Sequence, residues 1–149
     1  MKVKKSPFIL KSFLLLKQNI DFISMDTEAS PDVLSLFDSY NIDIDFAVND
    51  VDKTFTNIFV KIEVNTDKNH KAGYKITAEG VGVFEFEKQA KLTKQQKANY
   101  IYFSGISICI NSLRAIITNI TAYCPFGKYT LPSIDVNSLL TDTKQSGEK

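Results

Sequence analysis

Three segments of the chain alternate apolar and polar residues with the period of a β-strand, and no helical pattern separates them. They are residues 41–48, 54–66 and 72–87. In NIDIDFAV, the first of them, the isoleucines, Phe and Val fall on one face and the aspartates on the other. A fourth segment, residues 7–24, precedes them and is rich in aromatic and β-branched residues. Four strands joined by short polar turns predict an antiparallel sheet.

The connection between the first two strands is the longest one before the helical part of the chain. It consists of DTEASPD (26–32), a cluster of turn-forming residues, and VLSLFDSY (33–40), a short apolar crossover. Later in the sheet, Gly80 and Gly82 interrupt the last strand, which predicts a bulge or the close approach of another backbone.

The stretch that follows the strands predicts one long helix with two apolar sides. It comes after a lysine-rich linker or short helix at 88–100 and ends at Pro125 and Gly127. One apolar row, with helical spacing, contains Phe103, Ile106, Ile110, Leu113, Ile117 and Ile120. A second row, displaced around the helix, contains Tyr102, Ile106, Cys109, Leu113, Ile116, Ile120 and Tyr123.

One row is enough to cover a sheet, so the second row needs another partner. We expect that partner to be a second copy of the chain, with an oligomer interface at Tyr102, Cys109, Ile116 and Tyr123. The alternative is that the C-terminal segment folds back over the helix. That segment has few large apolar residues, chiefly Ile134, Leu139 and Leu140.

Strands followed by helices predict an α+β fold: a four-stranded antiparallel sheet, then a long helix and a short C-terminal helix. Ser133 or Asp135 is expected to cap the short helix. The length of 149 residues predicts a single domain over 1–149, with a core at about 7–141 and a frayed tail at 142–149.

Charge and cysteine content exclude several classes of protein. The net charge is +1, which gives no reason to expect nucleic acid as a partner. Lys11 and Lys17 interrupt the apolar N-terminal stretch, and nothing matches the ~20 apolar residues of a membrane span, so no membrane insertion is expected. Cys109 and Cys124 are predicted to lie about 20 Å apart along a helix. Free thiols are typical of a cytoplasmic protein.

No combination of residues predicts an enzyme, a cofactor or a metal site. The one histidine, His70, lies in a polar loop, and two distant cysteines cannot complete a zinc site with it. Asp43 and Asp45 are interpreted as the solvent side of a strand. EGVGVF (79–84) has Glu85 where a dinucleotide loop has its third glycine.

The order of elements and several short motifs resemble the SecB family of bacterial export chaperones. NSLRAIITNITAYCPFGKYTLPSIDVNSLL (111–140) follows the layout of the end of the family's chain: a helix with an arginine, an aromatic turn, an apolar stretch and a short helix. Arg114 falls on the helix arginine and Phe126 on the turn aromatic. GYKITAEGVGVFEF (73–86) and IDID (42–45) resemble two of the family's strands. The resemblance covers about residues 10–140.

The resemblance implies a chaperone that binds unfolded or precursor polypeptides without ATP, for protein export. It implies a homotetramer, a dimer of dimers with the long helices in the middle. The acidic side chains with which the family contacts the SecA motor fall on Asn19, Ile23 and Thr77. A contact that depends on charge complementarity is not expected to survive that replacement, so the SecA partnership is in doubt.

Apolar residues beside the sheet are the candidates for polypeptide binding, and each of them has ordinary core packing as its alternative. They are Val33, Leu34, Leu36, Phe37, Tyr40, Ile42, Ile44, Phe126, Leu139 and Leu140. Two other functions stay open at this point. One is a SecB-like chaperone dedicated to a single partner, such as the antitoxin of a toxin–antitoxin system. The other is a small protein that binds an apolar ligand.

Overall fold

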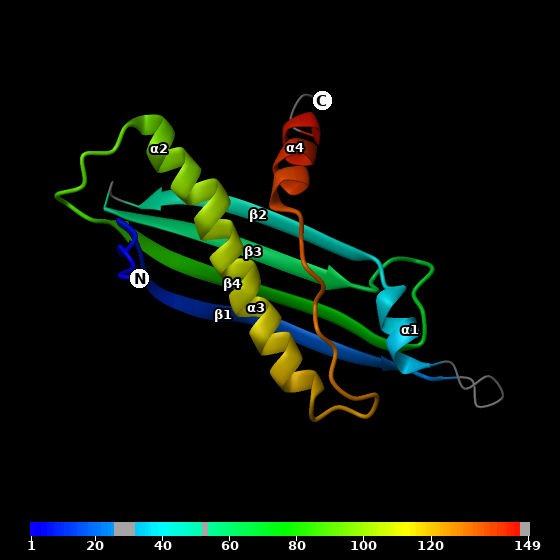
Figure 1. Cartoon of the computed structure of the whole chain (residues 1–149). Helices are drawn as coiled ribbons and strands as arrows, with labels where there is room; N and C mark the ends of the chain where they lie inside the picture. The colour runs from blue at the N-terminus through cyan, green and yellow to red at the C-terminus, as the bar shows by residue number, and fades with distance from the viewer. Residues whose placement is uncertain (26–31, 52–53, 147–149) are drawn as a thin grey trace.

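A computed structural model of the chain describes residues 1–25, 32–51 and 54–146. Its centre is a four-stranded antiparallel sheet, as predicted, and the strand order is β1-β4-β3-β2 (Figure 1). The strands are β1 (Phe8–Ile23), β2 (Ile42–Val51), β3 (Phe55–Val64) and β4 (Gly73–Phe86). Most of the turn cluster predicted at 26–32 lies outside the described residues.

One continuous helix crosses a single face of this sheet (Figure 1). It is built from α2 (Lys94–Asn99), the π-helical segment η1 (Tyr100–Gly105) and α3 (Ile106–Thr121). By length and composition alone, the helix over 94–121 could cross a bilayer, but 33% of its apolar window is buried inside the fold. Helices that pack in a protein core have the same length and composition.

Of two shorter helices, α1 (Val33–Asp38) lies at one end of the sheet and α4 (Val136–Ser146) lies beside the edge strand β2 (Figure 1). The crossover predicted at 33–40 contains α1, which begins after Asp32, whose carboxylate accepts a hydrogen bond from Leu34 N at 3.2 Å. The C-terminal helix α4 begins directly after Asp135, whose Oδ1 accepts a hydrogen bond from Asn137 N at 3.0 Å. α4 thus extends beyond the tail boundary expected at 142, while 147–149 lie outside the described residues.

The core lies between the sheet and the long helix. Every second residue of β3 and β4 points toward the helix, and these side chains are buried. α3 contributes a stripe of buried residues, namely Ile106, Cys109, Ile110, Leu113, Ile117 and Thr121. On the opposite face of the sheet Phe55 and Phe59 are exposed, so the two faces have different roles.

Glycines let the helix approach the sheet closely, as Gly80 and Gly82 suggested. A Cβ atom at Gly82 would lie 2.6 Å from Cys109 Sγ, and one at Gly80 would lie 3.2 Å from a methyl group of Leu113. On the helix, a Cβ atom at Gly105 would lie 2.3 Å from Ile58. The bulges occur instead in β1, where the register shifts between Leu10 and Ser12 and between Leu15 and Lys17.

A tyrosine hydroxyl joins the crossover to the start of β4. Tyr40, 6% exposed, donates to Ala72 O at 2.8 Å and accepts from Tyr74 N at 2.9 Å. Tyr74 in turn donates to Gly127 O at 2.9 Å and accepts from Phe126 N at 2.9 Å. These two side chains hold three segments that are far apart in the sequence.

Tyr40→Phe is therefore expected to destabilise the protein. The substitution leaves the carbonyl of Ala72 and the amide of Tyr74 without this partner, and unmade buried hydrogen bonds cost about 1–3 kcal/mol. Urea denaturation followed by circular dichroism measures the change. An unfolding midpoint equal to that of the wild type would show that the two backbone groups find other partners.

Candidate functional site

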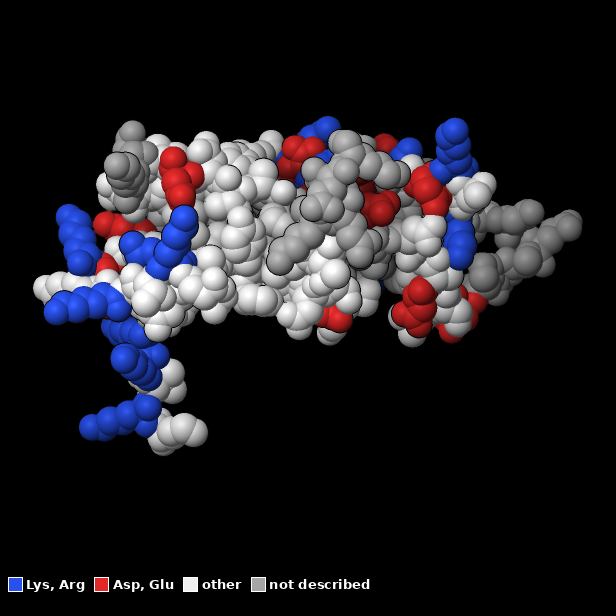
Figure 2. All heavy atoms as spheres, turned by 90° about the horizontal axis from the view of Figure 1, so that it is seen from above, with Lys and Arg blue, Asp and Glu red and all other residues white. Residues whose placement is uncertain are grey.

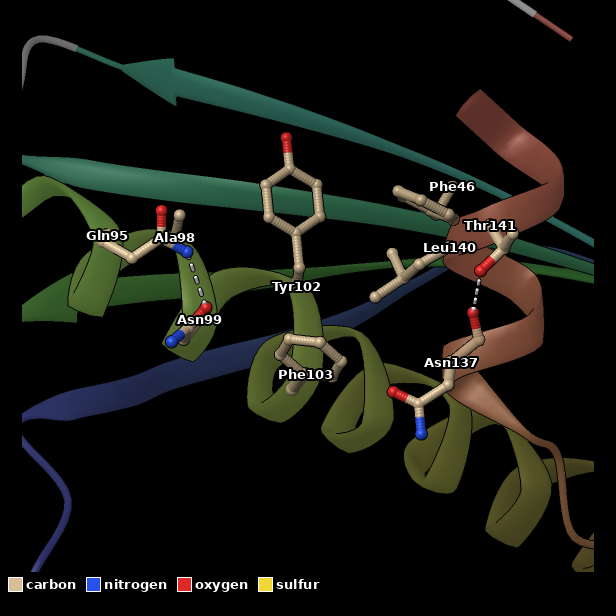
Figure 3. A pocket seen from close by; sticks show the side chains of 9 residues that line it. All are labelled: Phe46, Gln95, Ala98, Asn99, Tyr102, Phe103, Asn137, Leu140 and Thr141. Atoms are coloured by element: carbon tan, nitrogen blue, oxygen red, sulfur yellow. Dashed lines mark hydrogen bonds between the residues drawn. The ribbon is translucent and has the colours of Figure 1, made fainter. Parts of the chain in front are cut away.

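A cavity lined in part by β2 lies between the first half of the long helix and α4 (Figure 3). Its volume is about 730 Å³. We call it the α4 groove. It is lined by Phe46, Gln95, Ala98, Asn99, Tyr102, Phe103, Asn137, Leu140 and Thr141.

The α4 groove has an apolar interior and an uncharged polar rim. Phe46 and Tyr102 face one another with their ring centroids 6.4 Å apart, and Leu140 lies beside them from α4 (Figure 3). On the rim, Gln95 Nε2 donates to Asn99 Oδ1 at 3.2 Å, and Thr141 Oγ1 donates to Asn137 O at 2.9 Å. None of the lining residues is charged. Such a surface suits apolar side chains together with the polar backbone that carries them.

The π-helical segment η1 explains why Tyr102 and Phe103 are available in this groove. Ile106 N donates to Ile101 O, five residues earlier, so the helix is locally wider than an α-helix. The extra residue changes the phase between α2 and α3. Phe103 is 46% exposed, although a regular helix would place it in the same row as Ile106, which is fully buried. The apolar rows predicted from the sequence assumed a regular α-helix of 3.6 residues per turn. They therefore placed Phe103 on the same buried face as Ile106, which is wrong.

The second cavity, of about 310 Å³, lies between α1 and the segment that leads to α4. We call it the α1 pocket. It is lined by Leu34, Phe37, Asp38, Tyr40, Ile42, Lys128, Tyr129, Thr130 and Pro132. Arg114 of α3 holds this wall, because its guanidinium donates to Leu131 O at 2.9 Å and to Pro132 O at 2.8 Å. The arginine singled out in the sequence therefore positions one side of the pocket.

Both cavities lie along the same face of β2. Ile42 lines the α1 pocket, Phe46 lines the α4 groove, and Ile44 lies between them on the strand. Four residues of a strand span about 13 Å. An extended segment of another chain could therefore place side chains in both cavities.

The structure brings some of the predicted binding residues to these cavities and buries others. Four of the predicted residues line the α1 pocket, namely Leu34, Phe37, Tyr40 and Ile42, and Leu140 lines the α4 groove. Val33, Leu36, Ile44 and Leu139 are half-buried against the core.

Phe37 and Tyr40 also line the α1 pocket, but they are only 8% and 6% exposed and are held by ring contacts and hydrogen bonds, so they form its buried wall. Phe126 is half-buried and packs its ring against Phe22 and Tyr74, away from either cavity.

Sequence reasoning missed Phe46 and Tyr129 as lining residues. Phe46 lies on the same apolar face of the strand as Ile42 and Ile44, so the sequence pattern could have added it to the binding candidates. No sequence signal separates Tyr129 from an ordinary core residue.

One residue of the predicted oligomer interface needs correction. Cys109 is fully buried beneath the sheet, with its thiol 3.8 Å from Ile58 O, so it cannot contact a second copy. It belongs to the face that the helix turns toward Gly82. Tyr123 is 94% exposed, Ile116 is half-buried and Tyr102 lies in the α4 groove, so an interface through these three stays a prediction.

Within the described residues, no group of three or more His, Cys, Asp or Glu side chains could hold a metal ion. Burial raises the pKa of the Cys109 thiol to about 11, which keeps it protonated and unreactive at neutral pH.

The chain matches the family model described as SecB, preprotein translocase subunit SecB, over residues 9–147. No curated protein matches it. Among solved structures, its fold is similar to that of a Mycobacterium tuberculosis SecB-like chaperone in complex with a ChAD peptide from the HigA1 antitoxin, with a TM-score of 0.59 and 11% identity over 86% of this chain and 88% of that one. A Streptococcus agalactiae protein of unknown function matches with a TM-score of 0.45 and 10% identity, over 85% and 97% of the two chains.

Proposed function

Because the chain belongs to the SecB family, we propose that it is a molecular chaperone that holds non-native polypeptides in the α4 groove and the α1 pocket. The observation that carries this proposal is the α4 groove, a cavity of about 730 Å³ with an aromatic and aliphatic interior and no charged lining residue. The activity requires neither ATP nor an enzymatic step, because holding a client needs only binding.

The geometry favours extended clients. In an extended chain every second side chain points to the same side, so residues i and i+4 of a client are about 13 Å apart. This distance matches the separation of the two cavities along β2, from Ile42 to Phe46. The glutamine and asparagine side chains of the groove rim can form hydrogen bonds to the client backbone, which carries no sequence information. This combination suits a broad range of client sequences.

The charge distribution supports the same proposal. Seen from above, a broad area without Lys, Arg, Asp or Glu lies next to the lysine-rich end of the molecule (Figure 2). Uncharged surface of this kind costs little to desolvate when an apolar segment binds. Clients bound here would include precursors for export, and we place the activity in the cytoplasm, without membrane insertion.

The test is suppression of aggregation of a client diluted from denaturant, followed by light scattering. We expect scattering to fall in proportion to added protein and to be abolished near one tetramer per client. The absence of any effect on several unrelated clients would contradict the proposal.

A chaperone dedicated to one partner is a second candidate. The observation that favours it is the similarity in fold to a chaperone solved with an antitoxin peptide. A dedicated chaperone should bind one small protein at 1:1 stoichiometry and bind unrelated unfolded clients much more weakly. Similar affinity for several unrelated clients would favour the general chaperone.

We also propose that the protein acts as a homotetramer, a dimer of dimers. Exposed apolar side chains occur on the edge strand β1, where Leu14 and Leu16 are 52% and 54% exposed, and at Tyr123 of the turn after α3. Surface of this kind is typical of an interface between copies. A monomeric mass by light scattering would contradict it.

SecA is not included among the proposed partners. Asn19 and Thr77 pair in register between β1 and β4, and neither carries the negative charge of the family's SecA contact. Binding of SecA at physiological salt would contradict this part of the proposal.

A further inference from the structure

Tyr129 carries a buried hydroxyl group that has no hydrogen-bond partner among the described residues. The side chain is 2% exposed. The neighbouring tyrosines, Tyr40 and Tyr74, each use their hydroxyl both as donor and as acceptor. Buried polar groups in native proteins are almost always paired, so an unpaired one points to a function or a ligand.

The ring of Tyr129 is fixed at the α1 pocket. Its backbone N–H donates to Thr121 Oγ1 at 2.9 Å, and its ring packs edge-on against Phe37 with the centroids 5.4 Å apart. The pocket that it lines also contains Tyr40 and Asp38. Burial, then the proximity of Tyr40 and of Asp38, raise the pKa of Tyr129. The hydroxyl therefore keeps its proton at neutral pH and remains a hydrogen-bond donor.

We propose that the Tyr129 hydroxyl donates a hydrogen bond to a main-chain carbonyl of the client residue whose side chain fills the α1 pocket. This inference rests on the proposed function and adds one specific contact to it. The client supplies an extended segment with a small or medium apolar residue, for which the pocket of about 310 Å³ has room.

A main-chain carbonyl is the acceptor that fits this donor. Every residue of an extended client has one, so the contact does not restrict the client's sequence. An acidic side chain in its place would be repelled by the Asp38 carboxylate at the pocket. The hydroxyl is buried in the free protein, so contact with a client requires the wall of the α1 pocket to rearrange.

The substitution Tyr129→Phe tests whether the hydroxyl binds the client or only stabilises the fold. The probe is a reduced and carboxymethylated lactalbumin, which stays unfolded. Loss of one neutral hydrogen bond predicts an increase in Kd of about 3- to 10-fold. Urea denaturation of the free variant should show a stability equal to or above that of the wild type, because the substitution removes an unpaired buried hydroxyl. Tyr100→Phe is the matched control, since Tyr100 is half-buried and lines neither the α1 pocket nor the α4 groove, and it should change neither measurement.

Two results would overturn the inference. Unchanged probe affinity in Tyr129→Phe would show that the hydroxyl does not contact the client. A loss of stability as large as that of Tyr40→Phe would show that the hydroxyl already has a structural partner, such as an enclosed water. If the wild type itself fails to bind the probe, the proposed function fails; if it binds and Tyr129→Phe binds equally well, only this inference fails.

A second measurement identifies the acceptor. In a peptide from the probe that binds, replacing one amide by an ester weakens the preceding carbonyl as an acceptor. One position along the peptide should lose about 3- to 10-fold in affinity for the wild type and nothing for Tyr129→Phe. Equal losses for both proteins at every position would overturn the assignment to the main chain.

Discussion

Cys109→Asp is expected to leave the protein unfolded. Cys109 is 0% exposed and stands over Gly82, where the helix and the sheet are so close that no Cβ atom would fit. The same desolvation that raises the pKa of the thiol to about 11 acts on a carboxylate in its place. A buried, unpaired charge costs more than about 4 kcal/mol, a large part of the stability of a small domain.

Circular dichroism and urea denaturation measure this effect, and the same helix offers a control. Ala115 lies on the exposed side of α3, so Ala115→Asp should keep the wild-type spectrum. If that side contacts another copy, Ala115→Asp should also lower the mass measured by light scattering. A folded Cys109→Asp with a wild-type unfolding midpoint would mean that α3 turns a different face to the sheet.

Tyr102→Asp is expected to weaken client binding at least 10-fold while the protein stays folded. Tyr102 faces Phe46 across the α4 groove, and removal of an aromatic anchor from the centre of a binding site costs about 2 kcal/mol or more. The new charge adds desolvation to that loss when an apolar client segment enters. Suppression of client aggregation should be lost over the same concentration range.

Phe59→Asp is the matched control for this prediction. Phe59 is 38% exposed and Tyr102 is 40% exposed, but Phe59 lies on the open face of the sheet, away from the helix. We expect Phe59→Asp to hold clients as well as the wild type does. Equal losses in both variants would show that clients bind exposed apolar surface in general and not the groove. Light scattering of both variants shows whether a change in oligomeric state contributes.

The strands could be predicted closely because their signal is local. The alternation in 41–48, 54–66 and 72–87 correctly located β2, β3 and β4. The sequence also contains capping residues that mark the starts of two helices, but these residues were not used in the prediction. Asp32 caps α1, and Thr93 with Gln96 forms a capping box that fixes the start of α2 at Lys94.

The binding cavities were predictable only in part. Five predicted residues line the cavities, because apolar residues of the crossover, of the second strand and near the C-terminus were named: Leu34, Phe37, Tyr40, Ile42 and Leu140. Tyr102 was predicted to lie in an interface between copies of the chain. Its place in the α4 groove depends on η1 and on α4, which is distant in the sequence.

The sequence by itself determined the antiparallel sheet, the long helix and the two faces of each strand. These follow from covalent geometry, which gives strands a period of 2 and helices a period of 3.6 whatever the environment. The tertiary structure decided which side of the helix is buried. Gly80 and Gly82 have no side chains, which leaves room on the sheet for Leu113 and Cys109. The π-helical segment before these two residues changes which side of the helix faces the sheet. Burial depends on complementary shape between distant segments, which no local pattern contains.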